Sequence, residues 1–316
     1  MFIELAFKGD NTWWKVWLTA ILSTAVFLVN FVFFLVLPED RLENVYDSLK
    51  HVPNNLMLVI GLLPFIFLLA LLLFLVHFLH ERSIVSLTTS RAKIDFKRIG
   101  FSAGLIVFFS VVAFIISYFV DNSGIIWNFK PMQFTILFIL SILLFPMQIA
   151  FEEYLFRGFL MQQIGIVIGN RWFPLLVTSV LFGLFHSANP EVAELGFGIM
   201  AFYIGTGLFL GIMTLMDEGL ELALGFHFGN NLVASLLITS DFSALQTDAL
   251  FRYSGINDPS ALLNEMLITM AVTYPIFLLI LAKKYKWSGW KEKLTGKIKF
   301  YGNAVSEKAD GEPYIQ

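Results

Sequence analysis

The sequence contains no cysteine, which excludes disulfide bonds, thiolate metal sites and a cysteine nucleophile. Charge is also scarce, because only 14% of the residues are Asp, Glu, Lys or Arg, where a soluble domain has about a quarter. The formal net charge of -3 indicates no role in binding nucleic acid. Hydrophobic residues make up 57% of the chain, and the mean hydropathy is +0.75. This composition is typical of a polytopic membrane protein.

Apolar stretches long enough to cross a bilayer of about 30 Å recur along the chain. We expect eight spans, near residues 16–37, 55–80, 100–120, 134–164, 172–188, 195–216, 220–239 and 266–282. The first is longer than a signal-peptide core and lacks a following small-x-small cleavage site, so it is predicted to be retained. None shows the alternation of a membrane β-strand. The predicted fold class is therefore all-α, a polytopic transmembrane helical bundle without a soluble domain.

We divide the chain into four parts. Residues 1–133 hold three N-terminal spans, and residues 134–239 hold a core of four helices. Residues 240–282 form an outer loop and the last span, followed by a Lys-rich tail at 283–316.

The charges of the loops predict the orientation. Loop 81–99 and the tail after the last span are rich in Lys and Arg, whereas loops 38–54 and 240–265 are mainly acidic. Because basic loops stay in the cytoplasm, we expect both termini there, in what we take to be a bacterial cell membrane. The short turn 217–219 falls on the same side without a positive charge, which runs against this pattern.

Two adjacent carboxylates stand out, because Glu152 and Glu153 follow the apolar run 134–150 without a turn signal. One acid at the bilayer centre costs about 2.5 to 3.5 kcal/mol on insertion scales, so the pair predicts a functional site. Arg157 lies four residues after Glu153 and can pair with it on one helix face.

His186, on the fifth predicted helix, lies as far from residue 169 as Glu152 does, and residue 169 is in the turn between helices four and five. The two side chains should therefore share one level, about 25 Å from that turn. His227 and Asn231, four apart on the seventh helix, reach this level if the hairpin projects about 13 Å into the cytoplasm. We expect these residues to surround one cavity in the cytoplasmic half of the bundle, open toward the cytoplasm.

Such a group of side chains can activate water. Two imidazoles and a carboxylate (His186, His227 and Glu153) can hold a zinc ion with a position left for water, and a second carboxylate then acts as base. Without metal, a glutamate can deprotonate water directly with help from histidine. In either case Asn231 can donate to an oxyanion. The residues leave both routes open.

Each residue also has a structural interpretation. Glu153 and Arg157 can form an ion pair without function, a buried histidine is often simply hydrogen-bonded, and Asn231 can link helices. A second histidine pair, His77 and His80, ends the second span at the membrane interface, where polar residues need no special explanation.

Glu152-Glu153-x-x-x-Arg157, Phe182-x-x-x-His186 and His227-x-x-x-Asn231 together resemble the three signature motifs of the CPBP intramembrane proteases. That family includes type II CAAX prenyl endopeptidases and bacterial bacteriocin-processing or immunity proteins, and the resemblance covers about residues 134–239.

The resemblance implies an intramembrane metalloendopeptidase that acts on a membrane-anchored or prenylated peptide. It implies that Glu152 activates water, that Glu153 and Arg157 support it, and that His186 and His227 are ligands or catalytic histidines. Asn231 would stabilise the oxyanion. A metal-free mechanism has also been proposed for the family, and this sequence has no His-Glu-x-x-His helix.

Two alternatives come from other classes of protein. One is a non-catalytic immunity or binding protein that keeps the fold. The other is an ion or proton transporter that uses Glu152 and Glu153 as carriers, which is less favoured because the sequence shows no internal repeat. The expected partners are the lipid bilayer and a membrane-associated peptide, and the oligomeric state is left open.

Overall fold

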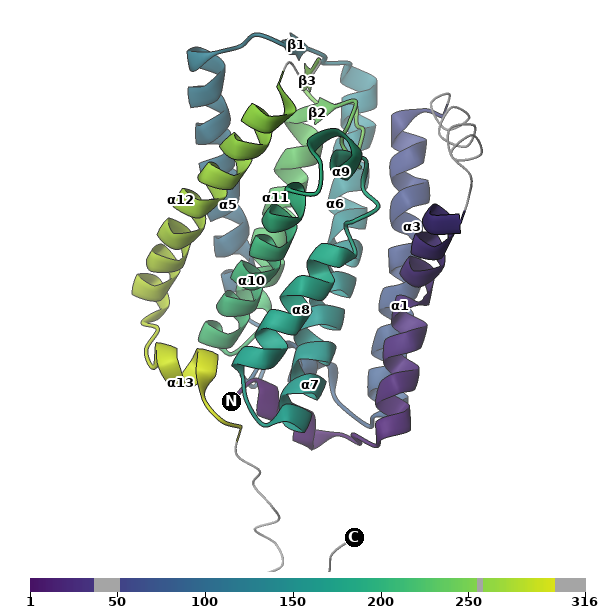
Figure 1. Cartoon of the computed structure of the whole chain (residues 1–316), viewed down its shortest axis with the longest axis vertical. Coiled ribbons are helices and arrows are strands. Elements are labelled where there is room, and N and C mark those ends of the chain that lie inside the picture. Colours follow the sequence, from purple (N-terminus) through teal and green to yellow (C-terminus); the bar gives the residue numbers. More distant parts are fainter. Residues whose placement is uncertain (37–51, 255–257, 299–316) are drawn as a thin grey trace, which may run out of the picture.

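The computed structural model describes residues 1–36, 52–254 and 258–298. Residues 37–51, 255–257 and 299–316 lie outside the described residues, and with them most of the loop predicted at 38–54 and the end of the predicted tail. The described residues form a bundle of helices (Figure 1), which confirms the predicted all-α polytopic fold class.

The longer helices are α1 (Trp13–Val36), α3 (Asn54–Phe74), α5 (Phe96–Val120), α6 (Pro131–Glu153), α8 (Trp172–Leu184), α10 (Ile199–Asp217), α11 (Glu221–Leu236) and α12 (Pro259–Tyr285). The shorter ones are η1 (Ile3–Lys8), η2 (Leu75–Leu79), α4 (Ile84–Thr88), η3 (Tyr154–Leu160), α7 (Met161–Ile168), α9 (Pro190–Leu195) and α13 (Trp290–Thr295). Three short strands, β1 (Ile125–Trp127), β2 (Ile238–Ser240) and β3 (Phe251–Tyr253), form a sheet in the order β1-β3-β2.

Five helical segments are long and apolar enough to cross a membrane, namely Asn54–Leu79, Phe96–Val120, Pro131–Ile168, Ile199–Asp217 and Pro259–Tyr285. The spans predicted at 172–188 and 220–239 form α8 and α11, of 13 and 16 residues. At about 1.5 Å per residue, each is shorter than the hydrocarbon layer. The chain is an integral membrane protein, and the number of eight spans stays a prediction.

The segment with the two glutamates is one long helix that changes its winding. Residues Pro131–Ile168 run through α6, η3 and α7, and η3 is a π-helix that begins directly after Glu153. π-Helical turns are rare in proteins, but those that occur are often found at functional sites. Every residue from Phe151 to Phe159 is buried, so this segment lies inside the bundle rather than against lipid.

Glycines let the site helices pack closely. A Cβ on Gly207 would lie 2.8 Å from the Ser179 carbonyl oxygen, so α10 contacts the backbone of α8. A Cβ on Gly229 would lie 2.7 Å from the Ala103 carbonyl oxygen, which brings α11 against α5 in the same way. Gly207 and Gly211 form a Gly-x-x-x-Gly pair, a spacing that predicts such close helix packing.

The two ends of the bundle differ. The N-terminus, α7 and α13 lie at the lower end in Figure 1, and the sheet and α9 lie at the upper end. At the lower end Arg91 and Arg98 donate to Asp217, with the Arg91 Nη2–Asp217 Oδ2 distance at 2.9 Å. The positive charge that turn 217–219 lacks is therefore supplied by loop 81–99 and by the first turn of α5. We call Arg91, Arg98, Asp217 and Glu221 the basal cluster.

Candidate active site

Glu152 lies at the end of α6 with one oxygen engaged and one free. The residue is 6% exposed, and Gln148, one turn earlier, donates from Nε2 to Glu152 Oε1 at 3.1 Å. The other oxygen, Oε2, is buried, has no hydrogen-bond partner and lies 3.7 Å from His227 Nε2. An unpaired buried acceptor is costly, so this oxygen is a candidate to bind a water or substrate proton.

Glu153 is held by two partners. Its Oε1 accepts from Arg157 Nη1 at 3.0 Å and from His227 Nδ1 at 2.9 Å, and Glu153 and Arg157 are fully buried. Arg157 also donates to the Gly207 carbonyl at 3.1 Å, and its guanidinium lies 4.3 Å from the centre of the Phe182 ring. The arginine therefore connects η3 to α10 and α8 and fixes the position of Glu153.

His227 projects from α11 between the two glutamates. Because a carboxylate only accepts hydrogen bonds, the contact with Glu153 places a proton on His227 Nδ1. In the neutral ring Nε2 then carries the lone pair and faces Glu152.

His186 follows the end of α8 at Leu184, so it lies in the turn before α9 and not inside the fifth helix as predicted. Its Nδ1 lies 2.7 Å from the Phe182 carbonyl oxygen, which also accepts only, so Nδ1 is the protonated nitrogen. The ring stacks on Tyr203 of α10 with centroids 4.6 Å apart. Both histidines thus have Nδ1 engaged and Nε2 available.

Asn231 lies one turn after His227 on α11. Its Oδ1 accepts from Asn230 Nδ2 at 3.3 Å, which leaves its NH2 group as a donor.

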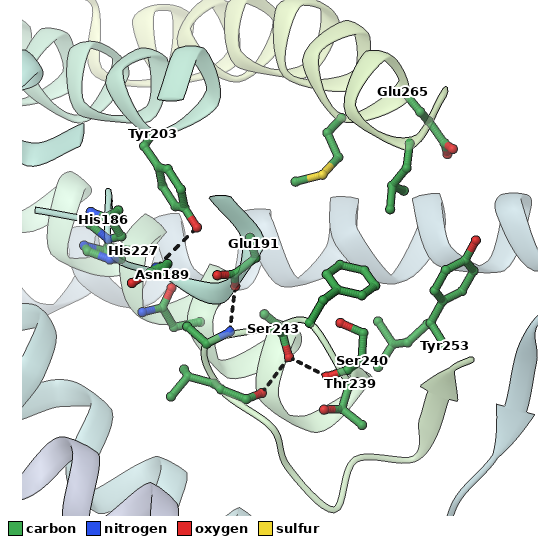
Figure 2. Close-up of a pocket in the computed structure, with 18 of the residues that line it drawn as sticks. His186, Asn189, Glu191, Tyr203, His227, Thr239, Ser240, Ser243, Tyr253 and Glu265 are labelled. Carbon is green, nitrogen blue, oxygen red and sulfur yellow. Dashed lines mark hydrogen bonds between the residues drawn. The ribbon is translucent and has the colours of Figure 1, made fainter. Parts of the chain in front are cut away.

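These side chains meet at one cavity of about 910 Å³, lined by Glu152, His186, His227 and Asn231. Glu153 and Arg157 stand behind it and are absent from its wall. In Figure 2 the two histidines lie at one end of the cavity, Glu191 lies between, and Tyr253 and Glu265 lie at the other end.

The cavity extends toward the end of the bundle that carries the sheet. Its wall includes Asp121 after α5, Ser240 of β2, Tyr253 of β3 and Asp258 before α12, and it includes none of the loop residues of the lower end. We predicted a cavity open toward the cytoplasm, the side to which we assigned the basic loop 81–99. The cavity instead opens away from the end that carries this loop and the N-terminus, so that prediction is wrong.

The cavity does not open at the lower end because packed side chains close the bundle below the site. Gln162 and Gln163 belong to the hairpin that was predicted to project about 13 Å into the cytoplasm, but both are buried. Gln162 donates to the Phe2 carbonyl at 3.1 Å, and the side chain of Ile3 in η1 packs against Gly165. Helices η1 and α4 thus close this end.

A zinc ion is not supported by this arrangement. The described residues contain no group of three or more His, Asp or Glu side chains placed to hold a metal ion. Glu153, one of the predicted ligands, uses Oε1 for Arg157 and His227. The zinc site stays a prediction.

Of the second histidine pair, His77 and His80, the contacts of His80 are structural. His80 Nε2 lies 2.9 Å from the Thr19 hydroxyl and its Nδ1 lies 2.7 Å from the Asp10 carbonyl oxygen. Both ring nitrogens are engaged away from the cavity, in contrast to those of His186 and His227.

Sequence reasoning missed Gln148 and Tyr203, which hold Glu152 and His186. Gln148 lies four residues before Glu152, a spacing that already places both on one face of α6. Nothing in the sequence signals the contact of Tyr203 with His186.

The cavity is surrounded by a buried glutamate with a free oxygen, two oriented histidines and an amide donor. These groups define a candidate hydrolytic site. Residues 131–233 match the family model of the "Type II CAAX prenyl endopeptidase Rce1-like" proteins. This match confirms the resemblance predicted from the three motifs. At the level of the family, this segment is similar to a CAAX-protease-like intramembrane domain.

One relative is the protein described as "Uncharacterized protein YyaK" of Bacillus subtilis (strain 168). It is 26% identical over 246 residues, which cover 73% of this chain and 80% of the relative. No solved structure matches the chain significantly.

Proposed function

We propose that the chain is an intramembrane endopeptidase that hydrolyses a peptide bond in a membrane-anchored or prenylated peptide. The observation that carries the proposal is the free Oε2 of Glu152, a buried acceptor at the wall of a cavity wide enough for a peptide. The match to the Rce1-like family supports the reaction class.

The first step is deprotonation of a water molecule in the cavity. Glu152 Oε2 takes one proton, and the lone pair of His186 or His227 Nε2 accepts the second hydrogen of the water as a hydrogen bond. The hydroxide attacks the peptide carbonyl carbon, and the C=O electron pair moves to the oxygen. Asn231 Nδ2 donates to this oxyanion.

The second step breaks the C–N bond. The oxyanion re-forms the carbonyl, the leaving nitrogen takes the proton from Glu152, and the carboxylate is restored. Glu153 does not touch the substrate, because Arg157 and His227 engage it behind the wall. Its role is to hold His227 in the orientation that presents Nε2.

Replacing the free oxygen tests the proposal. In proteoliposomes, cleavage of a farnesylated CAAX peptide and of an unmodified single-span peptide is followed by mass spectrometry. Glu152→Gln keeps the shape and removes the base, so cleavage should fall by about 10²- to 10⁴-fold with unchanged thermal unfolding. Glu194→Gln, an exposed glutamate of α9 outside the cavity wall, should cleave as the parent does. Full activity in Glu152→Gln would contradict the proposal.

Metal content separates the two routes. We expect the purified protein to remain active after dialysis against a chelator, with no zinc that is lost on His186→Ala or His227→Ala. Stoichiometric zinc lost in both variants, measured by elemental analysis, would establish the metal route instead.

A further inference from the structure

The wall of the cavity is acidic beyond the proposed catalytic residues. Four more carboxylates line it, those of Asp121, Glu191, Asp258 and Glu265, while the described lining includes no Lys or Arg. They come from three different parts of the chain, the end of α5, helix α9 and the start of α12. The cavity therefore carries a negative charge that does not depend on Glu152 and Glu153.

The basic residues described at this end of the bundle do not neutralise that charge. Lys130 pairs with Asp248 at 3.2 Å, and Arg252 pairs with Asp241, and neither carboxylate lines the cavity. Within the described residues, no ion pair joins a Lys or Arg to the four carboxylates of the wall. Their charges are thus available to a ligand.

Two carboxylates keep an oxygen that is buried without a hydrogen-bond partner. Glu191 Oε1 accepts from the Ala244 backbone N–H at 2.7 Å, but its Oε2 has no partner. Glu152 Oε2, on a residue only 6% exposed, also lacks a partner and lies at the histidine end of the cavity. Such oxygens indicate donors that a ligand would supply.

Aromatic rings stand beside these acids. Phe242 and Tyr253 line the cavity near the sheet, with their rings perpendicular and their centroids 6.4 Å apart. Lys and Arg side chains bind both to carboxylates and to the faces of such rings. An anionic ligand would meet only repulsion here.

We propose that the cavity selects a peptide that carries Lys or Arg on the sheet side of the cleaved bond and that enters from that end of the bundle. The proposal rests on the proposed endopeptidase function and names its substrate class as cationic. Since the N-terminus and the basic loop 81–99 lie at the other end of the described chain, the positive-inside rule places this entrance on the extracytoplasmic face.

Binding to the Glu152→Gln protein tests the charge preference without cleavage. Two labelled single-span peptides differ only in a Lys-Lys or a Glu-Glu pair beside the span, and their binding in nanodiscs is measured by fluorescence anisotropy. The Lys peptide should bind about tenfold more tightly, because like charges oppose the Glu peptide. The difference should shrink at high salt, which screens exposed charges.

Removing wall carboxylates should reduce this preference. Adding Asp258→Asn and Glu265→Gln to Glu152→Gln should lower it to about twofold. Asparagine keeps the cap that Asp258 makes on the α12 N-terminus. Adding Glu194→Gln instead, on the same end but outside the wall, should leave it unchanged.

Equal binding of the two peptides, tighter binding of the Glu peptide or no binding of either would overturn the inference. Cleavage by the protein with Glu152 intact is scored separately. Absence of cleavage of both peptides would count against the endopeptidase proposal, and the binding preference would still be decided by the anisotropy data.

Discussion

Two of the buried charged clusters among the described residues differ in how their carboxylates are used. In the basal cluster every carboxylate oxygen has a partner. Asp217 accepts from Arg98, Arg91 and Trp287, and Glu221 accepts from Arg91 at 3.2 Å and from the Asp95 backbone N–H at 3.3 Å. This cluster joins α5, α10 and α11 to the chain around Trp287 and leaves no acceptor for a ligand.

The second cluster, which we call the upper cluster, consists of Glu152, Glu153, Arg157 and His227. It has a similar composition, but not all of its carboxylate oxygens have a partner. Glu153 pairs with Arg157, as Asp217 pairs with Arg91, but one oxygen of Glu152 and one of Glu153 lack a partner. Only the upper cluster adjoins a cavity. Burial and ion pairing are therefore common to both clusters, whereas a free acceptor at a cavity wall is the feature on which the proposed function rests.

The largest expected effect breaks the basal cluster. Arg91→Met removes the shared partner of Asp217 and Glu221, which should cost about 3 to 5 kcal/mol of stability. Thermal and denaturant unfolding in detergent measure the loss. Peptide cleavage per folded molecule should stay within about twofold of the parent, because no basal residue lines the cavity.

Arg98→Met is the matched control, since Asp217 then keeps Arg91. It should cost clearly less than Arg91→Met. If the two variants lose the same stability, Arg91 is not the dominant partner of the two carboxylates. If cleavage per folded molecule collapses in either variant, the basal cluster is not a purely structural unit.

The next effect concerns Glu153, which shares features of both clusters. Glu153→Gln still offers an oxygen to Arg157 and His227 but removes the charge that orients the imidazole. We expect kcat to fall by about 10- to 100-fold with little change in KM, measured by initial rates. Asp217→Asn should instead lower the unfolding temperature and leave kcat of the folded protein unchanged. An effect of Glu153→Gln on KM alone would show that Glu153 acts on substrate binding.

These two clusters also show what the sequence predicts. The spacing of Glu152, Glu153, Arg157, His186 and His227 located the side chains that the structure brings together, because helical periodicity and hairpin symmetry are local properties. Their catalytic roles stay predictions. The sequence also showed that turn 217–219 lacks a positive charge. In the structure, Arg91 and Arg98 supply that charge from a distant part of the chain.

The direction of the cavity was out of reach of such local rules. It depends on η1 packing under α7 and on Gln162 bonding to Phe2, contacts that join the first residues of the chain to its middle. Apolar periodicity also gives no sign of the π-helical turn after Glu153, because π and α winding use the same apolar residues. Long-range packing at the lower end, rather than the helix content, therefore determines the end at which the cavity opens.

A smaller effect is expected at Gln148, which we assign as a positioning residue for Glu152. Gln148→Leu removes one hydrogen bond to Oε1, worth about 0.5 to 1.5 kcal/mol, so kcat should fall about two- to tenfold with unchanged KM. Ser141→Ala, two turns earlier on α6 and buried away from the cavity, should leave kcat unchanged. A fall in unfolding temperature without a change in kcat would assign Gln148 to packing only.

The smallest effect uses pH to separate the wall carboxylates. Burial raises the pKa of Glu191 above its ordinary value of 4.5, whereas hydrogen bonds from Ser123 and Ser260 lower the pKa of Asp121 and of Asp258. The folded state therefore binds the Glu191 proton more tightly than the unfolded chain does. The stabilisation from the protonated form is full below 4.5 and is lost as the pH rises through the raised folded value.

As the pH falls from 7, Glu191 should therefore become neutral before Asp121 and Asp258. The preference of the Glu152→Gln protein for the Lys peptide should then decrease by about twofold, the share of one of several charges. Adding Glu191→Gln should give the lower preference already at pH 7 and remove the part of the pH dependence that belongs to this residue. The two proteins differ only at position 191, so the contributions of all other groups cancel in the comparison. If the two proteins follow the same curve, Glu191 contributes no charge to substrate selection, and the acidic wall acts through Asp121, Asp258 and Glu265 alone.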